Sequence, residues 1–358
     1  MKNMKKNRFY QINLQRFAAR SILDLFNQKE VLDYTRNRVL PVLLGETLFP
    51  ARKTQSLELE QITGGGSSPI IASVHAFDTE SEIGSRQASK ATLELALIKR
   101  KMQLKEKDII ALENPRTPAE QQYLMSQVYN DMDVLVRGVN ARTELMRMEV
   151  LANGKITINE NGLDATIDYN VPSEHKEALT GTSLWTDPLS KPLEDIDRWS
   201  EAMDTTPTRV LTSKKILNAL LRNPQVKASV FGNDTGKVLT RAELDAFMQS
   251  NGMPVIRTYD EKYRKQNKDG SYTKARYFPE NKFVMFNDDL LGETIYGPTA
   301  EENRLSRDPS IDTSMVGNVF TAVYEESADP VSTWEKAVTV ALPSFAAADE
   351  VFQAQPIA

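Results

Sequence analysis

Two histidines, His75 and His175, are the side chains of this chain best suited to acid–base work or metal binding, and neither has a second histidine near it. The chain has no cysteine, which excludes thiolate zinc sites, cysteine nucleophiles and disulfides. A Ser-His-Asp triad would need one of the two histidines, and no G-x-S-x-G segment supports it. These residues favour a protein that carries out no catalysis.

The segment FGNDTGKVLT, residues 231–240, has the glycine and lysine of a phosphate-binding loop but not its spacing. Three residues separate Gly232 from Gly236 where the motif requires four, and Val238 stands where a Ser or Thr would hold magnesium. The glycine-rich GGGSSP lacks both the lysine and the following helix. Both segments are interpreted as turns.

Pairs of aspartates are the remaining candidates for chemistry, because carboxylate oxygens from several segments can bind a divalent cation. Such residues also form ordinary surface ion pairs, as Asp133 and Arg137 could at a spacing of four on a helix. A metal-dependent hydrolase therefore stays open as an alternative, although nothing shows that the pairs converge. The pairs are Asp131 and Asp133, Asp195 and Asp197, and Asp288 and Asp289.

Charge is unevenly placed along the 358 residues. Residues 1–53 hold eleven Lys or Arg against four Asp or Glu, a balance of +7, whereas the whole chain is −5. A basic end on an acidic body predicts an arm that contacts an anionic surface, and a solvated tail is the alternative. No apolar run is long enough to span a membrane, so no membrane contact is expected. The candidate anion contacts are Lys5, Lys6, Arg8, Arg16 and Arg20.

Two strand-like runs, SLELEQI and TLELALIK, alternate leucine with polar residues and are separated by a stretch rich in Gly, Ser and charge. This pattern predicts a two-stranded arm, which is marginally stable alone and so is expected to lie on another surface. A plain surface insertion is the alternative. The predicted inter-subunit contacts of the arm are Leu57, Leu59, Ile70, Ile71, Phe77, Leu93 and Leu95.

A helix of about 35 residues, roughly 50 Å long, is predicted from the start signal TPAE at Thr117 to the stop at Asn153-Gly154. A single apolar stripe along it predicts one buried face, and a coiled coil is disfavoured because paired charges are missing beside the stripe. The stripe consists of Leu124, Val128, Met132, Leu135, Val139, Met146 and Val150.

A hairpin around Asn161-Gly162 follows directly, in GKITINENGLDATIDYNVP. Residues 183–300 predict a mixed α/β unit, with helices in PLEDIDRWSEAM, SKKILNALLRN and TRAELDAFMQSNG and strands in TRVLTS and PVIRTYD. A second hairpin is predicted around Pro279 in DGSYTKARYFPENKFVMFND. The last strands, VFTAVYEE and KAVTVALPS, are expected to share a sheet with the 155–170 hairpin.

Several segments, in this order, resemble the lambda-type major capsid protein family of tailed phages, the E family. They are ETLFPARKTQSLELEQI, LALIKRKMQL, the Arg142-x-Glu144 and Leu151-x-x-Gly154-Lys155 positions at the helix end, IDYNVP with Trp185 and PLEDI, YFPENKFVMFNDDLLGETIYGPT, and SADPVSTWEKAVTVALPSF. No single segment is specific, but their order and spacing over residues 45–345 are.

The resemblance implies an α+β capsid shell fold: an N-terminal arm (1–55), an extended loop (56–106), a spine helix with a peripheral ribbon (107–182), an axial domain (183–300) and a return to the peripheral domain (301–358). It implies hexamers and pentamers that form an icosahedral shell around phage double-stranded DNA, with no catalysis and no cofactor. A long N-terminal scaffolding segment has no room before the arm strands, so the resemblance implies a separate scaffolding protein.

The same resemblance implies a portal partner, allows a decoration protein, and places the chain in the virion capsid after assembly in the host cytoplasm. An encapsulin-like nanocompartment shell, which would enclose a cargo enzyme rather than DNA, is the alternative within this fold. The metal-dependent hydrolase is the alternative from a different class.

Overall fold

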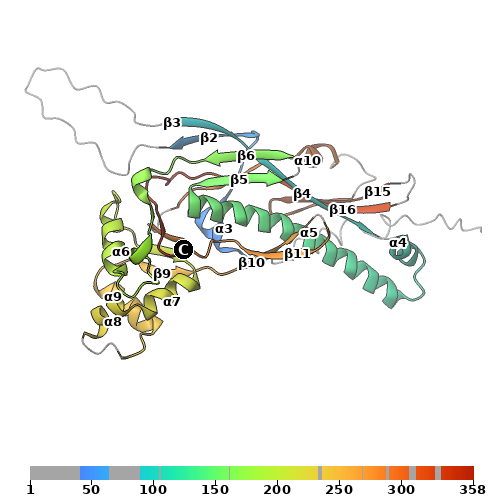
Figure 1. Cartoon of the computed structure of the whole chain (residues 1–358). Coiled ribbons are helices and arrows are strands. Elements are labelled where there is room, and N and C mark those ends of the chain that lie inside the picture. Colours follow the sequence, from blue (N-terminus) through green and yellow to red (C-terminus); the bar gives the residue numbers. More distant parts are fainter. Residues whose placement is uncertain are drawn as a thin grey trace, which may run out of the picture.

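The structure, a computed structural model, describes residues 41–63, 89–104, 106–160, 162–232, 236–267, 269–287, 290–305, 312–326 and 332–358. A long helix runs beside a six-stranded sheet, and a smaller α/β unit lies at the C-terminal end of that helix (Figure 1). Among the described helices, none combines the length and the hydropathy that a membrane span requires. The predicted α+β class is confirmed.

The predicted long helix is confirmed as α5, Pro118–Asn153. The Thr117 hydroxyl caps its start by accepting a hydrogen bond from the Glu120 amide at 3.1 Å. At the other end Gly154 adopts a φ of 68° and donates its amide to the Val150 carbonyl at 2.8 Å. The 36 residues of α5 therefore form a rod of about 54 Å, with both ends set by local sequence.

The six-stranded sheet is organised by its longest strand, β16 (Ser332–Pro343). One edge of β16 pairs with β4 (Ala96–Leu104) along most of its length. The other edge pairs with two strands in succession, β15 (Val319–Glu326) and β13 (Thr294–Gly297). The outer strands are β14 (Asp312–Val316) beside β15 and β1 (Ala51–Lys53) beside β13.

The hairpin after α5 forms as predicted, with β5 (Lys155–Glu160) paired to β6 (Leu163–Asp168) and Gly162 at a φ of 82° in the turn. The prediction that the C-terminal strands share a sheet with this hairpin is wrong. Both edges of β16 are already occupied, by β4 on one side and by β13 and β15 on the other. The hairpin therefore stays two-stranded and packs against α5, with Ile156 fully buried.

The smaller unit is a five-stranded mixed sheet in the order β7-β17-β12-β8-β9, covered by helices. Its core is aromatic, because Trp185 stacks on Trp199 and both contact Phe283. The predicted helices and strands of residues 192–258 are confirmed. The strands are β7 (Lys176–Ala178), β8 (Arg209–Thr212), β9 (Val255–Thr258), β12 (Phe283–Phe286) and β17 (Phe352–Gln355), and the helices are α6 (Pro192–Glu201), α7 (Lys214–Arg222), α8 (Pro224–Phe231) and α9 (Arg241–Ser250).

The predicted hairpin around Pro279 is wrong, although its two strands exist. Strand β11 (Tyr272–Arg276) pairs with β10 (Lys262–Gln266) in a separate ribbon, and β12 pairs with β8 and β17. All four residues of β12 are buried, so this strand needs neighbours on both edges. It therefore lies in the middle of the five-stranded sheet, and the exposed β11 takes another partner.

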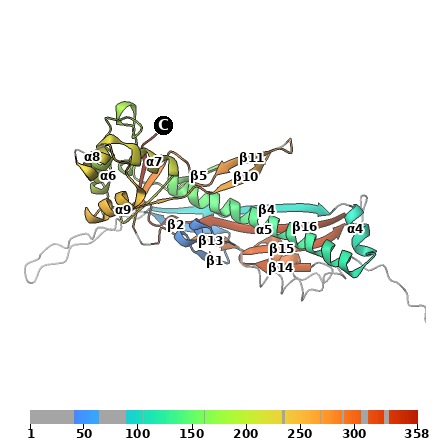
Figure 2. The same cartoon turned by 90° about the horizontal axis from the view of Figure 1, so that it is seen from below.

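The arm begins as predicted, with β2 (Glu58–Thr63) paired to β3 (Ser89–Glu94). The return strand then breaks at Leu95, and β4 joins the six-stranded sheet rather than the arm. Figure 2 shows α6, α8 and α9 gathered at one end of the molecule and α4 (Glu106–Glu113) at the other, with α5 between them. The remaining elements are α3 (Leu44–Leu48), α4 (Glu106–Glu113), α10 (Ala300–Leu305) and the short turns η1 (Ser173–His175) and η2 (Gly181–Ser183).

The packing of α5 on the sheet predicts the effect of a charge in that contact. Val139 is 1% exposed and lies in one cluster with Val319 and Ala337, so Val139→Asp places an unpaired carboxylate there. We expect a loss of about 3–5 kcal/mol in the free energy of unfolding, and mostly insoluble protein. The matched control is Val134→Asp, because the Val134 side chain is 49% exposed on the same helix. Soluble yield and urea denaturation measure both, and a stable Val139→Asp subunit would mean that the buried face is assigned wrongly.

Candidate functional site

A buried ion pair lies in the C-terminal third of α5. Glu144 is fully buried and the Arg147 side chain is 5% exposed, with Arg147 Nη1 3.4 Å from Glu144 Oε2. The two residues are three apart and so share one face of the helix. Charges removed from water in this way are tolerated only where further hydrogen bonds compensate each of them.

The Glu144 carboxylate is compensated from two distant segments. Its Oε1 accepts hydrogen bonds from the Gly45 amide and from the Tyr259 hydroxyl, both at 2.9 Å. A Cβ at Gly45 would lie 2.4 Å from Glu144 Oε2, so only glycine allows α3 to approach this closely. Burial and the neighbouring Glu144 carboxylate raise the pKa of Tyr259, which keeps its hydroxyl a donor.

The Arg147 guanidinium is compensated by strand β13. Its Nε donates to Thr294 Oγ1 at 2.8 Å and its Nη2 donates to the Tyr296 hydroxyl at 3.3 Å. Thr294 in turn donates its hydroxyl to the Phe49 carbonyl at 2.9 Å. The ion pair and these partners, here called the Glu144–Arg147 junction, therefore join α5, α3, β13 and the segment after β9.

The Glu144–Arg147 junction holds geometry rather than reacting groups. Both charges are used in hydrogen bonds within the chain. In the part of the chain that the structure describes, no group of three His, Asp or Glu side chains is placed to hold a metal ion. The sequence reasoning named Glu144 but missed Arg147, whose signal is a charge between apolar residues, three positions after Glu144 on the same face.

The residues of the predicted α5 stripe divide among three packing sites. Leu124 is partly buried and Val128 is buried, both in a cluster with Ile109 and Leu112 of α4. The middle of the stripe packs on the six-stranded sheet, and its C-terminal end lies in the largest core cluster. Leu135 and Val139 lie in a cluster with the six-stranded sheet, Met146 and Val150 lie in the largest core cluster, and Met132 is 6% exposed.

The predicted arm contacts do not share one environment. Leu59 and Leu95 are buried in the core of their own chain, which corrects their assignment as contacts to a neighbour. Leu93 packs partly against the same core, whereas Leu57 is 52% exposed. The other predicted contacts lie outside the described residues, namely Ile70, Ile71 and Phe77 of the arm and Lys5, Lys6, Arg8, Arg16 and Arg20 of the N-terminus.

The candidates for catalysis have structural surroundings where the structure describes them. His175 is buried beside Phe352, with its Nε2 3.2 Å from the Ala202 carbonyl oxygen. Asp195 accepts a hydrogen bond from Trp185 Nε1 at 2.9 Å. Gly232 ends α8 with a φ of 66°, as expected of a turn. His75, Asp288 and Asp289 lie outside the described residues.

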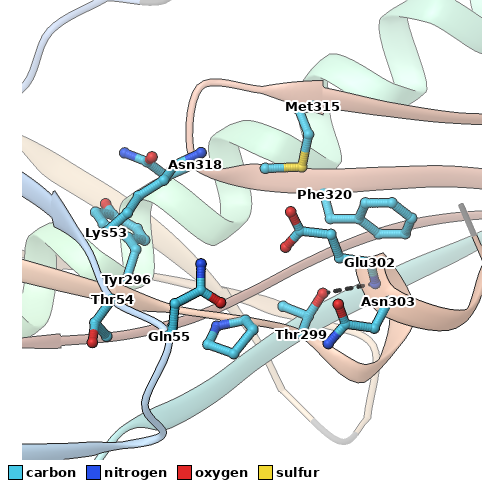
Figure 3. Close-up of a pocket in the computed structure, with 12 residues that line it drawn as sticks. Lys53, Thr54, Gln55, Tyr296, Thr299, Glu302, Asn303, Met315, Asn318 and Phe320 are labelled. Carbon is cyan, nitrogen blue, oxygen red and sulfur yellow. Dashed lines mark hydrogen bonds between the residues drawn. The ribbon is translucent and has the colours of Figure 1, made fainter.

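A small cavity of about 200 Å³ lies where the six-stranded sheet divides (Figure 3). The pairing of β13 ends opposite Val340 and the pairing of β15 begins opposite Val338, so the two strands follow one another along the same edge of β16. Amide, hydroxyl and charged side chains line much of the cavity, among them Gln55, Asn303 and Asn318. The cavity can exchange hydrogen bonds with a polar segment.

Glu335, on β16, is a buried carboxyl that the sequence reasoning did not identify. It is 1% exposed, and among the described residues neither of its oxygens has a hydrogen-bond partner. Burial, and next the nearby Asp131, raise its pKa from 4.5 to about 8. The signal in the sequence was strand alternation, which places Glu335 on the same face as the buried Ala337 and Thr339.

Comparison with known proteins gives a match over nearly the whole chain. The family model described as phage major capsid protein E matches residues 27–355. A structure described as the capsid protein of a prophage in Escherichia coli CFT073 has a TM-score of 0.61 at 14% identity, over 93% of this chain and 99% of that chain. A phage-related protein from Bordetella bronchiseptica RB50 has a TM-score of 0.51 at 12% identity, over 90% and 95%. No curated protein sequence matches the chain.

Removing one charge of the Glu144–Arg147 junction should destabilise the subunit more than removing one hydrogen bond. Glu144→Gln keeps the shape of the side chain but leaves Arg147 as a buried charge without its counter-ion. We expect the free energy of unfolding to fall by about 3–5 kcal/mol. Tyr259→Phe removes a single hydrogen bond to the carboxylate and should cost about 1.5–3 kcal/mol. Urea denaturation of both variants tests the order, and equal losses would contradict the ion-pair interpretation.

The raised pKa of Glu335 predicts a dependence of stability on pH. The folded subunit holds the proton up to a pKa of about 8, whereas the unfolded chain loses it near 4.5. The favourable contribution is therefore complete below about pH 4.5 and is lost as the pH rises through about 8. Glu335→Gln should remove this fall, so that wild type loses stability relative to the variant between pH 6 and pH 9. Parallel denaturation profiles across that range would show that Glu335 is not the responsible group.

Proposed function

Because the chain belongs to the phage major capsid protein E family, we propose that it assembles as hexamers and pentamers into an icosahedral shell around double-stranded DNA. The chain is a structural capsid subunit and not an enzyme, and copies of it associate to form a shell. The observation that supports the proposal most is the family match over residues 27–355, which includes both sheets and the whole of α5.

The form of the subunit supports a role for the β2–β3 arm in contacts between subunits. Leu59 and Leu95 anchor the base of the arm in the core, and the Leu95 amide donates to the Leu57 carbonyl at 2.9 Å. Leu57 and Leu97, at 52% and 53% exposed, leave apolar surface beside this base. A ribbon anchored in this way can lie across a neighbouring subunit and bury there what it exposes in the monomer.

The regions of the chain take the following proposed roles. Residues 1–55 form the N-terminal arm, 56–106 the extended loop, 107–182 the spine and its ribbon, 183–300 the axial domain, and 301–358 the return to the peripheral domain. Strand β17 is the exception within the last region, because it pairs with β7 and β12. The basic N-terminal residues would contact DNA non-specifically.

We further propose that assembly takes place in the host cytoplasm with a separate scaffolding protein, that a portal occupies one vertex, and that a decoration protein could bind outside. The alternatives have less support. The hydrolase requires convergent carboxylates, and among the described residues no group of three acidic or histidine side chains is placed to bind a metal ion. The nanocompartment differs in its contents, which the following experiment identifies.

Sedimentation and negative-stain microscopy of the full chain, co-expressed with its neighbouring genes, test the proposal. We expect hollow shells many times the mass of the 40.3 kDa subunit, and nucleic acid in particles from infected cells. A uniform dimer or tetramer under all conditions would contradict the shell. Closed shells that enclose a cargo enzyme and no DNA would favour the nanocompartment.

Deleting the arm beyond its base should separate folding from assembly. Removal of Gly64–Lys90 joins Thr63 to Ala91, which keeps the Gln61–Ala91 pair and leaves a two-residue turn. Because Leu59 and Leu95 remain, we expect a melting temperature close to that of wild type but few or no closed shells. Normal shells from this variant, seen by negative stain, would contradict the inter-subunit role of the arm.

A further inference from the structure

The β10–β11 ribbon concentrates positive charge on an acidic chain. Residues 262–276 contain six Lys or Arg and one Asp, a balance of +5, whereas the whole chain is −5. Lys262, Arg264, Lys265 and Lys274 are exposed. Figure 2 shows the ribbon running out beside α5 from the smaller unit. A two-stranded ribbon of this composition contributes little to the core, so its charges call for another explanation.

A groove of about 520 Å³ lies between this ribbon, α5, β4 and the β5–β6 hairpin. Four cations from three elements line it: Arg100 of β4, Arg142 of α5, and Arg264 and Lys265 of β10. Glu160 is the acid among the lining residues. The groove therefore has a net positive charge although the chain as a whole is acidic.

The carboxylate of Glu160 already forms ion pairs within the groove, whereas, as far as the structure describes the chain, the guanidinium groups of Arg100 and Arg264 do not. Glu160 Oε1 accepts from Lys265 Nζ at 2.8 Å and from Arg142 Nη1 at 3.4 Å. In the described part of the chain, Arg100 lies over Gly138 and donates a single hydrogen bond, to the neutral amide of Gln266 at 3.3 Å. Among the described residues neither Arg100 nor Arg264 forms an ion pair. Two guanidinium groups therefore face the groove with donors available for an anion.

The chemistry of the groove suits phosphate better than a protein segment. Guanidinium groups donate two parallel hydrogen bonds to a phosphate, and exposed lysines further along the ribbon extend the same positive charge. Ala141, Leu145 and Tyr263 give the groove apolar surface that a protein segment could also cover, but the surplus of cations favours an anionic partner. A regular polyanion matches this arrangement.

We propose that this groove binds the phosphate backbone of packaged double-stranded DNA, with Arg100 and Arg264 each contacting one phosphate. The inference rests on the proposed function, because it requires a shell that encloses DNA. It assigns the face of the subunit formed by α5 and the β10–β11 ribbon to the interior of the shell.

The test compares two double variants with the same loss of charge. Arg100→Gln with Arg264→Gln removes the two available cations, and Lys214→Gln with Arg222→Gln removes two exposed cations from α7 as the control. Binding of a fluorescent random-sequence duplex to unassembled full-length subunits is measured by anisotropy against salt. The slope of log affinity against log salt is negative, and the groove variant should make it shallower by about 1.8. Its affinity would then fall about 12-fold less than that of wild type over a fourfold rise in salt.

The control should keep the wild-type slope, and both variants should still form shells when co-expressed with the neighbouring genes. An unchanged slope for the groove variant, or no duplex binding by wild type, would overturn the inference. A groove variant that binds DNA normally but forms no shells would also overturn it, and would assign the groove to an acidic protein segment. Failure of the proposed function would appear separately, as the absence of shells from wild type.

Discussion

The subunit depends on one constraint, that a carboxylate and a guanidinium buried inside it must both be compensated. Glu144 and Arg147 meet this requirement with partners from α3, from the segment after β9 and from β13. Because those partners lie in different parts of the chain, satisfying two charges on α5 also fixes where the two sheets lie relative to the helix. Apolar packing alone would tolerate small slips of one sheet against the other, whereas hydrogen bonds of 2.8 to 2.9 Å to a buried charge do not.

The parts of this fold that could be predicted from the sequence are those determined by neighbouring residues. Thr117, Ser213 and Thr240 each cap a helix that begins at the next residue, and Gly162 takes the left-handed conformation that its hairpin needs. Strand partners could not be predicted in the same way. Which strand lies beside β16 or β12 depends on edges formed by segments far away in the chain, and the pattern of each strand is compatible with several partners.

The candidate site was less predictable than the fold for the same reason. Arg147 and Glu335 look like surface residues by type, and the surrounding structure establishes that both are buried. Leu59 and Leu95 show the opposite case, because alternation identified an apolar face but not whether that face packs on its own chain or on a neighbour. A sequence pattern identifies which residues must be buried, and the tertiary structure determines which surface they pack against.

The hydrogen bond from Thr294 to the Phe49 carbonyl has a consequence for the order of folding. It closes a loop of 245 residues, and the parallel pairing of β1 with β13 closes the same loop. Such contacts give the subunit a high contact order, so closure of the core is expected to be slow. During synthesis, α5 and its hairpin can form early, but the N-terminal segment has no strand to pair with until β13 has left the ribosome. The edge of β1 therefore stays open through most of translation, and in that interval a nascent chain is most exposed to pairing with the wrong partner.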